Sequence, residues 1–339
     1  MTARLGDPVR LTLDLCGVES TTGSEAHVME LAAGLCRTLG LAVRTQEVGA
    51  PGRVNVAAWD PAVAPEVLFT THLDTVPPYL PPAELADRLT GRGTCDAKGA
   101  AAAMLCALSG LRQAGELRVG VMFLVGEETE SDGARAAATG FAPRLRYFIN
   151  GEPTGLTLAS AQKGTLSFRL VADGMAGHSA YPERGRSATH ALVDAAHALL
   201  HHTWPADPEL GDTTVNVGLL DGGVAPNVLA PSATARGIFR LGMPVDDAER
   251  TARALLPPHV RLERLGGTDP VRCHVPPGEH AEVVRFGSDI PYLQSVGTPL
   301  LLGPGSIHDA HTDHEHVLKA DLIEGTRRYA ALARALLGG

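Results

Sequence analysis

The sequence predicts an α/β protein in which a mixed or parallel sheet flanked by helices is interrupted by a smaller α+β insertion. The first part of the chain alternates helical and strand patterns, as the sheet of an α/β protein requires. The middle gives the order β-α-β-β-α-β, which is the ferredoxin-like split unit. At 339 residues the chain is too long for one ordinary core. We therefore expect a larger domain formed by 1–162 and 269–339, and a ferredoxin-like domain at 163–268.

In the first part, apolar periodicity predicts an amphipathic helix near 24–39 with Ser24 as its N-cap. The alanine-rich stretch 98–111 predicts a buried helix, because small side chains let a helix approach the sheet closely. The other elements expected in this part are strands near 41–47, 53–58, 66–70, 119–125 and 147–149 and a short helix near 132–139.

The middle of the chain changes character, and the tail from about 271 adds further elements. The pattern predicts strands at 165–172, 213–219, 232–241 and 260–264 and helices at 187–202 and 246–256. The tail is expected to end in a helix over 321–336.

Composition narrows the classes of function. The chain is 44% apolar and 4% aromatic, as in ordinary globular proteins, and its net charge of −9 argues against nucleic acid as a partner. Its five cysteines form no CxxC pair, so we expect no disulfide framework and a reducing, cytoplasmic setting. The amino terminus has no basic region followed by an apolar core, and no apolar run approaches ~18 residues. We therefore expect neither export nor a membrane partner.

Side chains suited to a metal follow several of the expected strands. His72, the adjacent Glu127 and Glu128, and Glu152 each come directly after an apolar run, and Asp96 lies among glycines before a helix. Open α/β sheets bind ligands at the carboxyl ends of their strands. Zinc and similar metals take imidazole nitrogen and carboxylate oxygen. Together these stretches predict a metal-dependent hydrolysis site.

Each residue also has a plainer interpretation. Asp74, two residues after His72 on an extended segment, would point to the same side and orient the imidazole; the alternative is a buried histidine satisfied by a local carboxylate. Asp96 offers two oxygens that could bridge two cations; the alternative is a helix N-cap. For Glu152 the alternative is a turn beside Gly151 and Pro153.

The adjacent Glu127 and Glu128 are predicted to have different roles. Two neighbouring carboxylates are costly unless a cation neutralises one of them. One would be a metal ligand and the other a general base toward a metal-bound water. The alternative is a solvated loop that also carries Glu130 and Asp132.

Histidines in the tail and on a predicted helix are further candidates. Spacing cannot choose among the four imidazoles of the tail, which are His308, His311, His314 and His316. His197 and His201 form an i, i+4 pair that could coordinate a metal. No neighbouring carboxylate supports such a site, so we expect both histidines on the surface.

Seven ordered motifs carry a family resemblance over essentially the full chain. They are His72-Leu-Asp74-Thr-Val-Pro77, Gly91-Arg-Gly93 through Asp96-Ala-Lys98-Gly99, Gly126-Glu-Glu128, Gly151-Glu-Pro-Thr154, Gly177-His-Ser179, Gly222-Gly223 with Asn227, and His311-Thr312 with Glu315. The chain resembles the cocatalytic zinc peptidases and deacylases, which include acetylornithine deacetylase, succinyl-diaminopimelate desuccinylase, aminoacylase and the glutamate carboxypeptidases.

The resemblance implies two Zn²⁺ per chain, with Co²⁺ or Mn²⁺ as substitutes. His72 and Glu152 would bind one ion, Glu128 and His311 the other, and Asp96 would bridge them. Asp74 would orient His72, and Glu127 would be the general base that acts on a metal-bridged hydroxide. Cys95, just before Asp96, is a departure at a position where family members vary. A thiol there could make the site sensitive to oxidation, but we expect a small buried filler.

The resemblance also makes the ferredoxin-like domain a lid through which the protein forms a homodimer. His178 resembles the histidine that crosses the dimer interface to stabilise the oxyanion of the neighbouring site. Asn227 and Arg240 align with residues that hold the substrate and its carboxylate. An ordinary loop histidine, a turn asparagine and a surface arginine are the alternatives.

The resemblance favours hydrolysis of an N-acyl amino acid, as by acetylornithine deacetylase, with a dipeptidase or carboxypeptidase as the close alternative. Two-metal phosphoester hydrolysis uses similar ligands, but the chain lacks a basic phosphate cradle. A non-catalytic binding protein would be expected to have lost ligands or base. The expected partners are therefore a small N-acyl amino acid or short peptide and a second copy of the chain.

Overall fold

A computed structural model describes residues 2–338, which fold as two compact units. Within the described residues, the larger unit comprises 2–160, 272–282 and 288–338. The smaller unit comprises Ala161–Val271 and Val283–Gly287. The smaller unit is thus inserted between two parts of the larger one along the chain.

A six-stranded sheet forms the centre of the larger unit, in the order β1-β2-β6-β3-β7-β17. Its strands are β1 (Ala42–Glu47), β2 (Val54–Trp59), β3 (Val67–His72), β6 (Val119–Leu124), β7 (Tyr147–Asn150) and β17 (Thr298–Leu301). The pairs β1–β2 and β2–β6 are antiparallel, whereas β6, β3, β7 and β17 run parallel to one another. The expected mixed sheet is confirmed, and the carboxyl ends of its four parallel strands lie at one edge.

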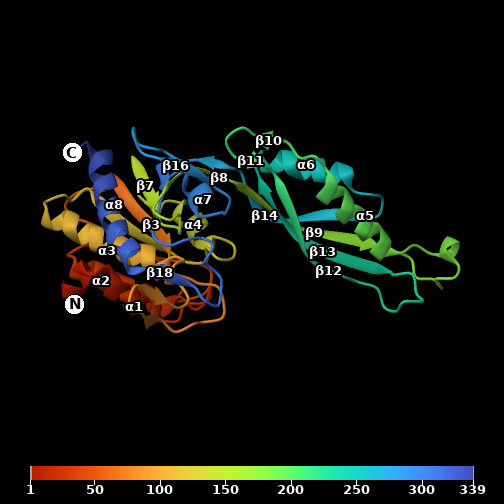
Figure 1. The fold of residues 1–339 in the computed structure, drawn as a ribbon, viewed down its shortest axis with the longest axis horizontal. Coiled ribbons are helices and arrows are strands. Elements are labelled where there is room, and N and C mark those ends of the chain that lie inside the picture. Colours follow the sequence, from red (N-terminus) through yellow and green to blue (C-terminus); the bar gives the residue numbers. More distant parts are fainter. Residues whose placement is uncertain (1, 339) are drawn as a thin grey trace. The chain divides into compact units, whose positions relative to one another are not determined.

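Helices cover this sheet on both faces (Figure 1). In Figure 1, α2, α3 and α8 lie to one side of the sheet, and α4 and α7, which contact each other, lie to the other. The buried alanines at 100–103 let α3 pack closely against β3 and β6, and α8 packs beside α3. The bounds of the helices are η1 (Thr2–Gly6), α1 (Pro8–Cys16), α2 (Ala26–Thr38), α3 (Lys98–Gln113), α4 (Asp132–Ala137), α7 (Ile290–Leu293) and α8 (Lys319–Leu337).

The predicted N-cap of α2 is wrong. The helix begins at Ala26, and the residue in the cap position is Glu25, whose side chain makes no capping hydrogen bond. Ser24 instead belongs to a turn in which its N–H donates to the carbonyl of Thr21. The fully buried Glu25 carboxylate pairs with Arg53, a contact between distant segments that the local pattern does not encode.

The smaller unit has the ferredoxin-like arrangement. Its elements are β9 (Gly164–Asp173), α5 (Ala188–His201), β12 (Thr214–Gly222), β13 (Ser232–Leu241), α6 (Val245–Leu255) and β14 (Val260–Thr268). The sheet order is β12-β13-β9-β14, and every pair is antiparallel. Both helices share one core with β9 and β13. This order matches the split β-α-β-β-α-β unit and leaves β12 as an edge strand.

Shorter elements complete the chain. They are β4 (Ala83–Glu84), β5 (Arg88–Thr90), β8 (Leu158–Gln162), η2 (Pro182–Arg184), β10 (Ala206–Asp207), β11 (Gly211–Asp212), β15 (Val271–Arg272), β16 (Ala281–Val284) and β18 (His316–Leu318). They form the small sheets β18-β5-β4, β15-β8-β16 and β10-β11. No helix within residues 2–338 is long and apolar enough to cross a bilayer.

Candidate metal centre

The parallel strands of the larger unit deliver the predicted side chains to one edge of the sheet. His72 is the last residue of β3, Glu127 and Glu128 follow β6, and Glu152 follows β7. The strands themselves are buried throughout or nearly so. The side chains therefore extend from a rigid base, which is the arrangement that sites at strand ends rely on.

Asp96 lies between His72 and His311, two histidines that are far apart along the chain. Its Oδ1 is 3.2 Å from Nε2 of His72, and its Oδ2 is 3.3 Å from Nε2 of His311. The alternative that Asp96 caps α3 is wrong, because Ala97 occupies the cap position and no side chain caps the helix. A carboxylate with one oxygen facing each imidazole has the disposition of a bridging ligand.

Asp74 holds the other side of His72. Nδ1 of His72 lies 3.0 Å from the carbonyl oxygen of Asp74 and 3.4 Å from its Oδ1, so the ring is fixed with Nε2 facing Asp96. The Asp74 carboxylate also accepts the Thr22 hydroxyl at 2.7 Å. It accepts the backbone N–H groups of Glu127 and Glu128, each at 3.2 Å. Asp74 thus orients the imidazole and fastens the loop that carries both glutamates.

The adjacent glutamates have different surroundings. Glu128 faces His311, with 2.9 Å between its Oε2 and Nε2 of the imidazole. The Glu127 carboxylate makes no ion pair or side-chain hydrogen bond with any other residue in the range 2–338. Glu152 is buried, accepts Nδ2–H of Asn150 at 3.2 Å and has its Oε2 3.9 Å from Nε2 of His72. This asymmetry fits one glutamate as ligand and one as base, and the division of roles stays a prediction.

Within residues 2–338, one group of three side chains has its donor atoms mutually within 4.8 Å, and it comprises His72, Asp96 and Glu128. The chemistry of these donors, imidazole nitrogen and carboxylate oxygen, fits a zinc-like divalent cation. Glu152 and His311 adjoin the same group through the contacts above. The structure therefore brings together all five side chains predicted to be metal ligands.

The electrostatics of the cluster favour a bound cation. Burial raises the pKa of Glu127 and of Glu152 well above the usual value. Burial acts the same way on Asp96, but hydrogen bonds from His311 and His72 outweigh it and lower the pKa of Asp96. Hydrogen bonds to Asp96 and Glu128 raise the pKa of His311 to about 10. Without a metal the cluster thus retains protons, and a cation would take their place.

A buried ion pair positions the segment that carries Asp96. Oε1 of Glu315 accepts the backbone N–H groups of Gly93, Cys95 and Asp96 at 2.9, 3.1 and 3.2 Å. Its Oε2 accepts Nη1–H of Arg92 at 2.6 Å. The sequence gives Glu315 no role beyond its place in a motif, because its partners lie more than 200 residues away.

Two further residues escaped prediction. Thr22, which holds Asp74, belongs to an ordinary turn with no signal of its own. Asp289 is buried, burial raises its pKa to about 7, and its charge contributes to the raised pKa values of Glu127 and Glu152. A Ser-Asp pair before a short helix looks like a cap, so nothing local distinguished it.

The remaining histidines and Cys95 lie outside the group. Among the four tail imidazoles, His311 is the one whose ring contacts Asp96 and Glu128; His316 instead faces the carbonyl of His314 and lies 3.7 Å from Asp309. His197 and His201 stack at 4.0 Å between ring centroids on the exposed side of α5. The buried Cys95 thiol donates to the carbonyl of Ser306, as a small filler would.

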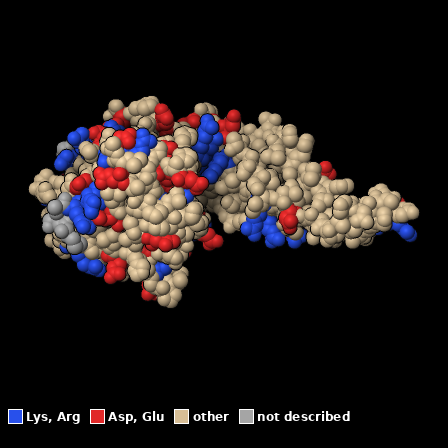
Figure 2. All heavy atoms as spheres, turned by 60° about the horizontal axis from the view of Figure 1, so that its bottom comes forward, with Lys and Arg blue, Asp and Glu red and all other residues tan. Residues whose placement is uncertain are grey.

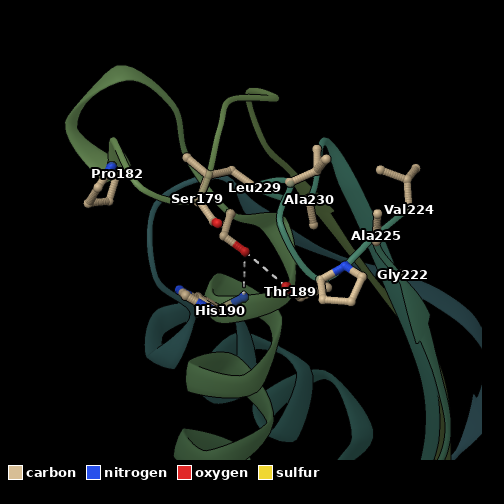
Figure 3. Close-up of a pocket in the computed structure, with 13 residues that line it drawn as sticks. Ser179, Pro182, Thr189, His190, Gly222, Val224, Ala225, Leu229 and Ala230 are labelled. Carbon is tan, nitrogen blue, oxygen red and sulfur yellow. Dashed lines mark hydrogen bonds between the residues drawn. The ribbon is translucent and has the colours of Figure 1, made fainter.

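Two of the three predicted lid residues are neighbours in the smaller unit. His178 forms a backbone bridge with Val228, and the N–H of Ser179 donates to the carbonyl of Asn227 at 3.0 Å. Both side chains are exposed. Beside them is a cavity of about 540 Å³, whose wall includes Ser179, Pro182, Leu229 and Ala230 (Figure 3). No Asp, Glu, Lys or Arg lines this cavity.

Arg240 lies at the other end of the same sheet. It is near the carboxyl end of β13, opposite Thr165 of β9, whereas Asn227 precedes the amino end of β13 at Ser232. Eight residues separate Ser232 from Arg240, which is about 26 Å of extended strand. The strand predicted at 232–241 implies this separation, because Asn227 precedes the strand and Arg240 lies near its end.

Comparison with known proteins identifies the family. The chain belongs to peptidase family M20/M25/M40, whose model matches residues 68–335. A probable carboxypeptidase of Aspergillus flavus is 36% identical over 370 residues, covering 96% of this chain and 86% of that protein. The resemblance inferred from the motifs is confirmed, and the protein is a hydrolase of peptide bonds.

Solved structures share the fold over the whole chain. A tripeptidase from Staphylococcus aureus has a TM-score of 0.80 at 20% identity, covering 100% of this chain and 99% of that one. The Bacillus subtilis YXEP protein, described as a dinuclear metal-binding peptidase of family M20, has a TM-score of 0.70 at 14% identity, with 100% and 99% covered. The predicted fold class is confirmed by these neighbours.

Proposed function

We propose that this chain is a two-metal amide hydrolase that releases a residue bearing a free carboxylate from a peptide or an acyl group. The observation that carries the proposal is the position of Asp96, whose two oxygens face two imidazoles. His72 and Glu152 would hold one ion and Glu128 and His311 the other. The best candidate for the metal is zinc, with cobalt or manganese as substitutes, because the donors mix imidazole and carboxylate.

When bound, two cations would polarise the scissile carbonyl and acidify a water. The chain's own part is proton transfer and positioning. Glu127 is the proposed general base: it takes a proton from the attacking water and returns it to the leaving amine. Its carboxylate is buried, and burial raises its pKa above the usual value, which suits a group that takes up a proton and passes it on. Asp74 keeps His72 and the Glu127 backbone in place meanwhile.

Peptides that end in a free carboxylate are the first substrate class to test. The relatives named probable carboxypeptidases favour them. N-acyl amino acids of the acetylornithine type, which the motifs favoured, present the same amide beside the same carboxylate and remain the second candidate. Arg240 is the proposed partner of that carboxylate, because its planar guanidinium can donate two parallel hydrogen bonds.

The proposed lid residues favour an active site built from two chains. Arg240 lies about 26 Å along β13 from the end near Asn227 and His178, which is too far for one dipeptide to contact all three side chains of a single chain. If all three serve catalysis, His178 and Asn227 must reach the site of a partner. We therefore propose that His178 stabilises the oxyanion in trans.

A second copy of the chain also suits the surface of the smaller unit. Its edge strand β12 has Leu219 and Leu220 exposed at 64% and 55%, and α5 exposes Val193 at 55% and Leu200 at 49%. In the view of Figure 2 the smaller unit shows a mostly uncharged surface. An open strand edge flanked by apolar side chains is a template for pairing between copies.

We further propose a cytoplasmic location, since all five cysteines are free thiols.

A substrate panel tests the proposal. The purified protein is loaded with zinc, cobalt or manganese and assayed on dipeptides, longer peptides, N-acetylornithine and other N-acyl amino acids, each with a free and an amide-capped carboxylate. We expect metal-dependent release of the carboxylate-bearing residue and poor cleavage of the capped analogues. Equal cleavage of capped and free substrates would contradict the substrate class, and activity unaffected by chelation would contradict the metal mechanism.

A further inference from the structure

Arg53 connects two carboxylates beside the metal centre. It directly precedes β2, and its Nε–H donates to both oxygens of Glu25 at 3.0 and 3.1 Å. Its Nη2–H donates to Oδ1 of Asp132 at 3.0 Å, and its Nη1–H donates to Oδ2. The Glu25 side chain is fully buried, and that of Arg53 is 11% exposed. Two paired contacts on one largely buried guanidinium fix its position closely.

The Arg53–Asp132 pair lies directly against the loop of residues 126–131, here called the glutamate loop because it carries Glu127 and Glu128. Asp132 is the residue that follows this loop and opens α4. Gly126 begins the loop with a φ of +76°, and a Cβ there would overlap Oδ1 of Asp132 and Nη2 of Arg53. The ion pair therefore packs against the residue immediately before Glu127.

Asn55, two residues beyond Arg53, holds both ends of the same loop. Its Oδ1 accepts the N–H of Val125 at 3.3 Å, and its Nδ2–H donates to the carbonyl of Gly133 at 2.8 Å. The N–H of Gly133 in turn donates to the carbonyl of Val125 at 3.1 Å. Asn55, near the amino end of β2, thus ties the two ends of the glutamate loop together. The Arg53–Asp132 pair packs against Gly126, the first residue of the loop.

The other carboxylate leads back to the metal centre by a second route. Oε2 of Glu25 accepts the N–H of Gly23 at 2.9 Å, which shapes the turn that carries Thr22. The Thr22 hydroxyl donates to Asp74, and the Asp74 carboxylate accepts the N–H groups of both residues that the glutamate loop carries. Arg53 is therefore connected to the glutamate loop by two routes. One is direct, through Asp132, and the other runs through Glu25, the turn that carries Thr22, and Asp74.

We propose that Arg53 is a positioning residue for the reaction: through Asp132 and Glu25 it sets where the glutamate loop presents Glu127 and Glu128. The effect on turnover rests on the proposed function, which assigns those glutamates as base and ligand. The required group is the planar fork of arginine, because a lysine ammonium is a point charge that cannot make paired contacts with two carboxylates.

Arg53→Lys is the test, since it keeps the charge and removes the fork. We expect kcat to fall about 10–100-fold with KM changed by less than about threefold, which is the range for groups that orient metal ligands. In the metal-free protein, amide hydrogen exchange at Glu127 and Glu128 should rise about tenfold or more, because the loop opens more easily. Asp132→Asn should reproduce both effects, and the double variant should be no worse than Arg53→Lys alone.

Arg112→Lys is the matched control. Arg112 is also largely buried, donates to Asp60 at 3.0 Å and to the carbonyl of Leu39 at 3.1 Å, and has no contact with the glutamate loop. We expect its kcat and the exchange of the loop amides to stay near wild-type values. Where Arg53→Lys fails to fold, Asp132→Asn alone carries the comparison.

The outcomes separate this proposal from the proposed function. Equal losses of kcat in Arg53→Lys and Arg112→Lys, or unchanged exchange at the loop amides, would overturn the positioning role. If the wild-type protein hydrolyses no peptide or N-acyl amino acid, the proposed function fails, while the exchange experiment still decides whether Arg53 holds the loop.

Discussion

The Glu315→Gln variant tests whether the Glu315 carboxylate holds Asp96 in position. In the native chain one carboxylate oxygen accepts three backbone N–H groups, including that of Asp96, and the other accepts from Arg92. A glutamine keeps the shape and can still accept the backbone bonds through its oxygen. Its amide nitrogen then faces the guanidinium, so a donor meets a donor and Arg92 stays buried without its anion.

The expected losses of stability and of metal affinity follow from these contacts. Breaking a buried ion pair by removing one partner costs about 3–5 kcal/mol. Because the three backbone bonds can persist, we expect the lower end, about 3 kcal/mol of unfolding free energy. The Asp96 N–H is one of the donors that Glu315 holds, so the carboxylate of Asp96 should also become less well placed. Metal affinity should then fall about 10–100-fold.

Urea unfolding of the metal-free protein measures the free energy of unfolding, and competition with a chromophoric chelator measures the metal affinity. The matched control is Asp60→Asn, because Asp60 likewise accepts a backbone N–H, from Ala62 at 2.9 Å, and an arginine, Arg112 at 3.0 Å. Asp60 follows β2 at the sheet edge opposite the metal centre. Equal metal affinity in Glu315→Gln and Asp60→Asn would refute the claim that Glu315 positions Asp96.

Three further predictions test the assigned roles. Glu127→Gln should keep its metals and lose several orders of magnitude in turnover, whereas Glu128→Gln should bind one metal more weakly; titration of metal and single-turnover rates would expose a reversed pattern. Arg240→Ala should slow cleavage of free-carboxylate substrates far more than that of amide-capped ones, and equal slowing would indicate a structural arginine. Mixed dimers of Glu127→Ala with His178→Ala should retain about half of wild-type activity if His178 acts in trans, but none if it acts within its own chain.

The metal ligands were predictable because buried strands leave a strong local signal. The apolar runs before His72 and Glu128 marked strands, and the parallel order of those strands brought their carboxyl ends together. The β-α-β-β-α-β order likewise specified the sheet of the smaller unit. In each case a few adjacent residues determine the element, and general rules of α/β architecture determine the rest.

The supporting residues were not predictable, since their partners are far along the chain. Glu315 reaches Gly93 across 222 residues and Arg53 reaches Asp132 across 79. The choice of His311 among four tail imidazoles depended on the path of the loop rather than on spacing. Ser24 failed as a cap because the buried Glu25–Arg53 pair, a tertiary contact, fixes the start of α2.

Metal content tests the central claim most directly. The purified protein is stripped with a chelator, titrated with zinc, and followed by elemental analysis and by activity on the substrates that the panel identifies. The account predicts two ions per chain, with activity restored in step with loading of the site around Asp96. Saturation at one ion per chain with full activity would contradict the two-metal centre.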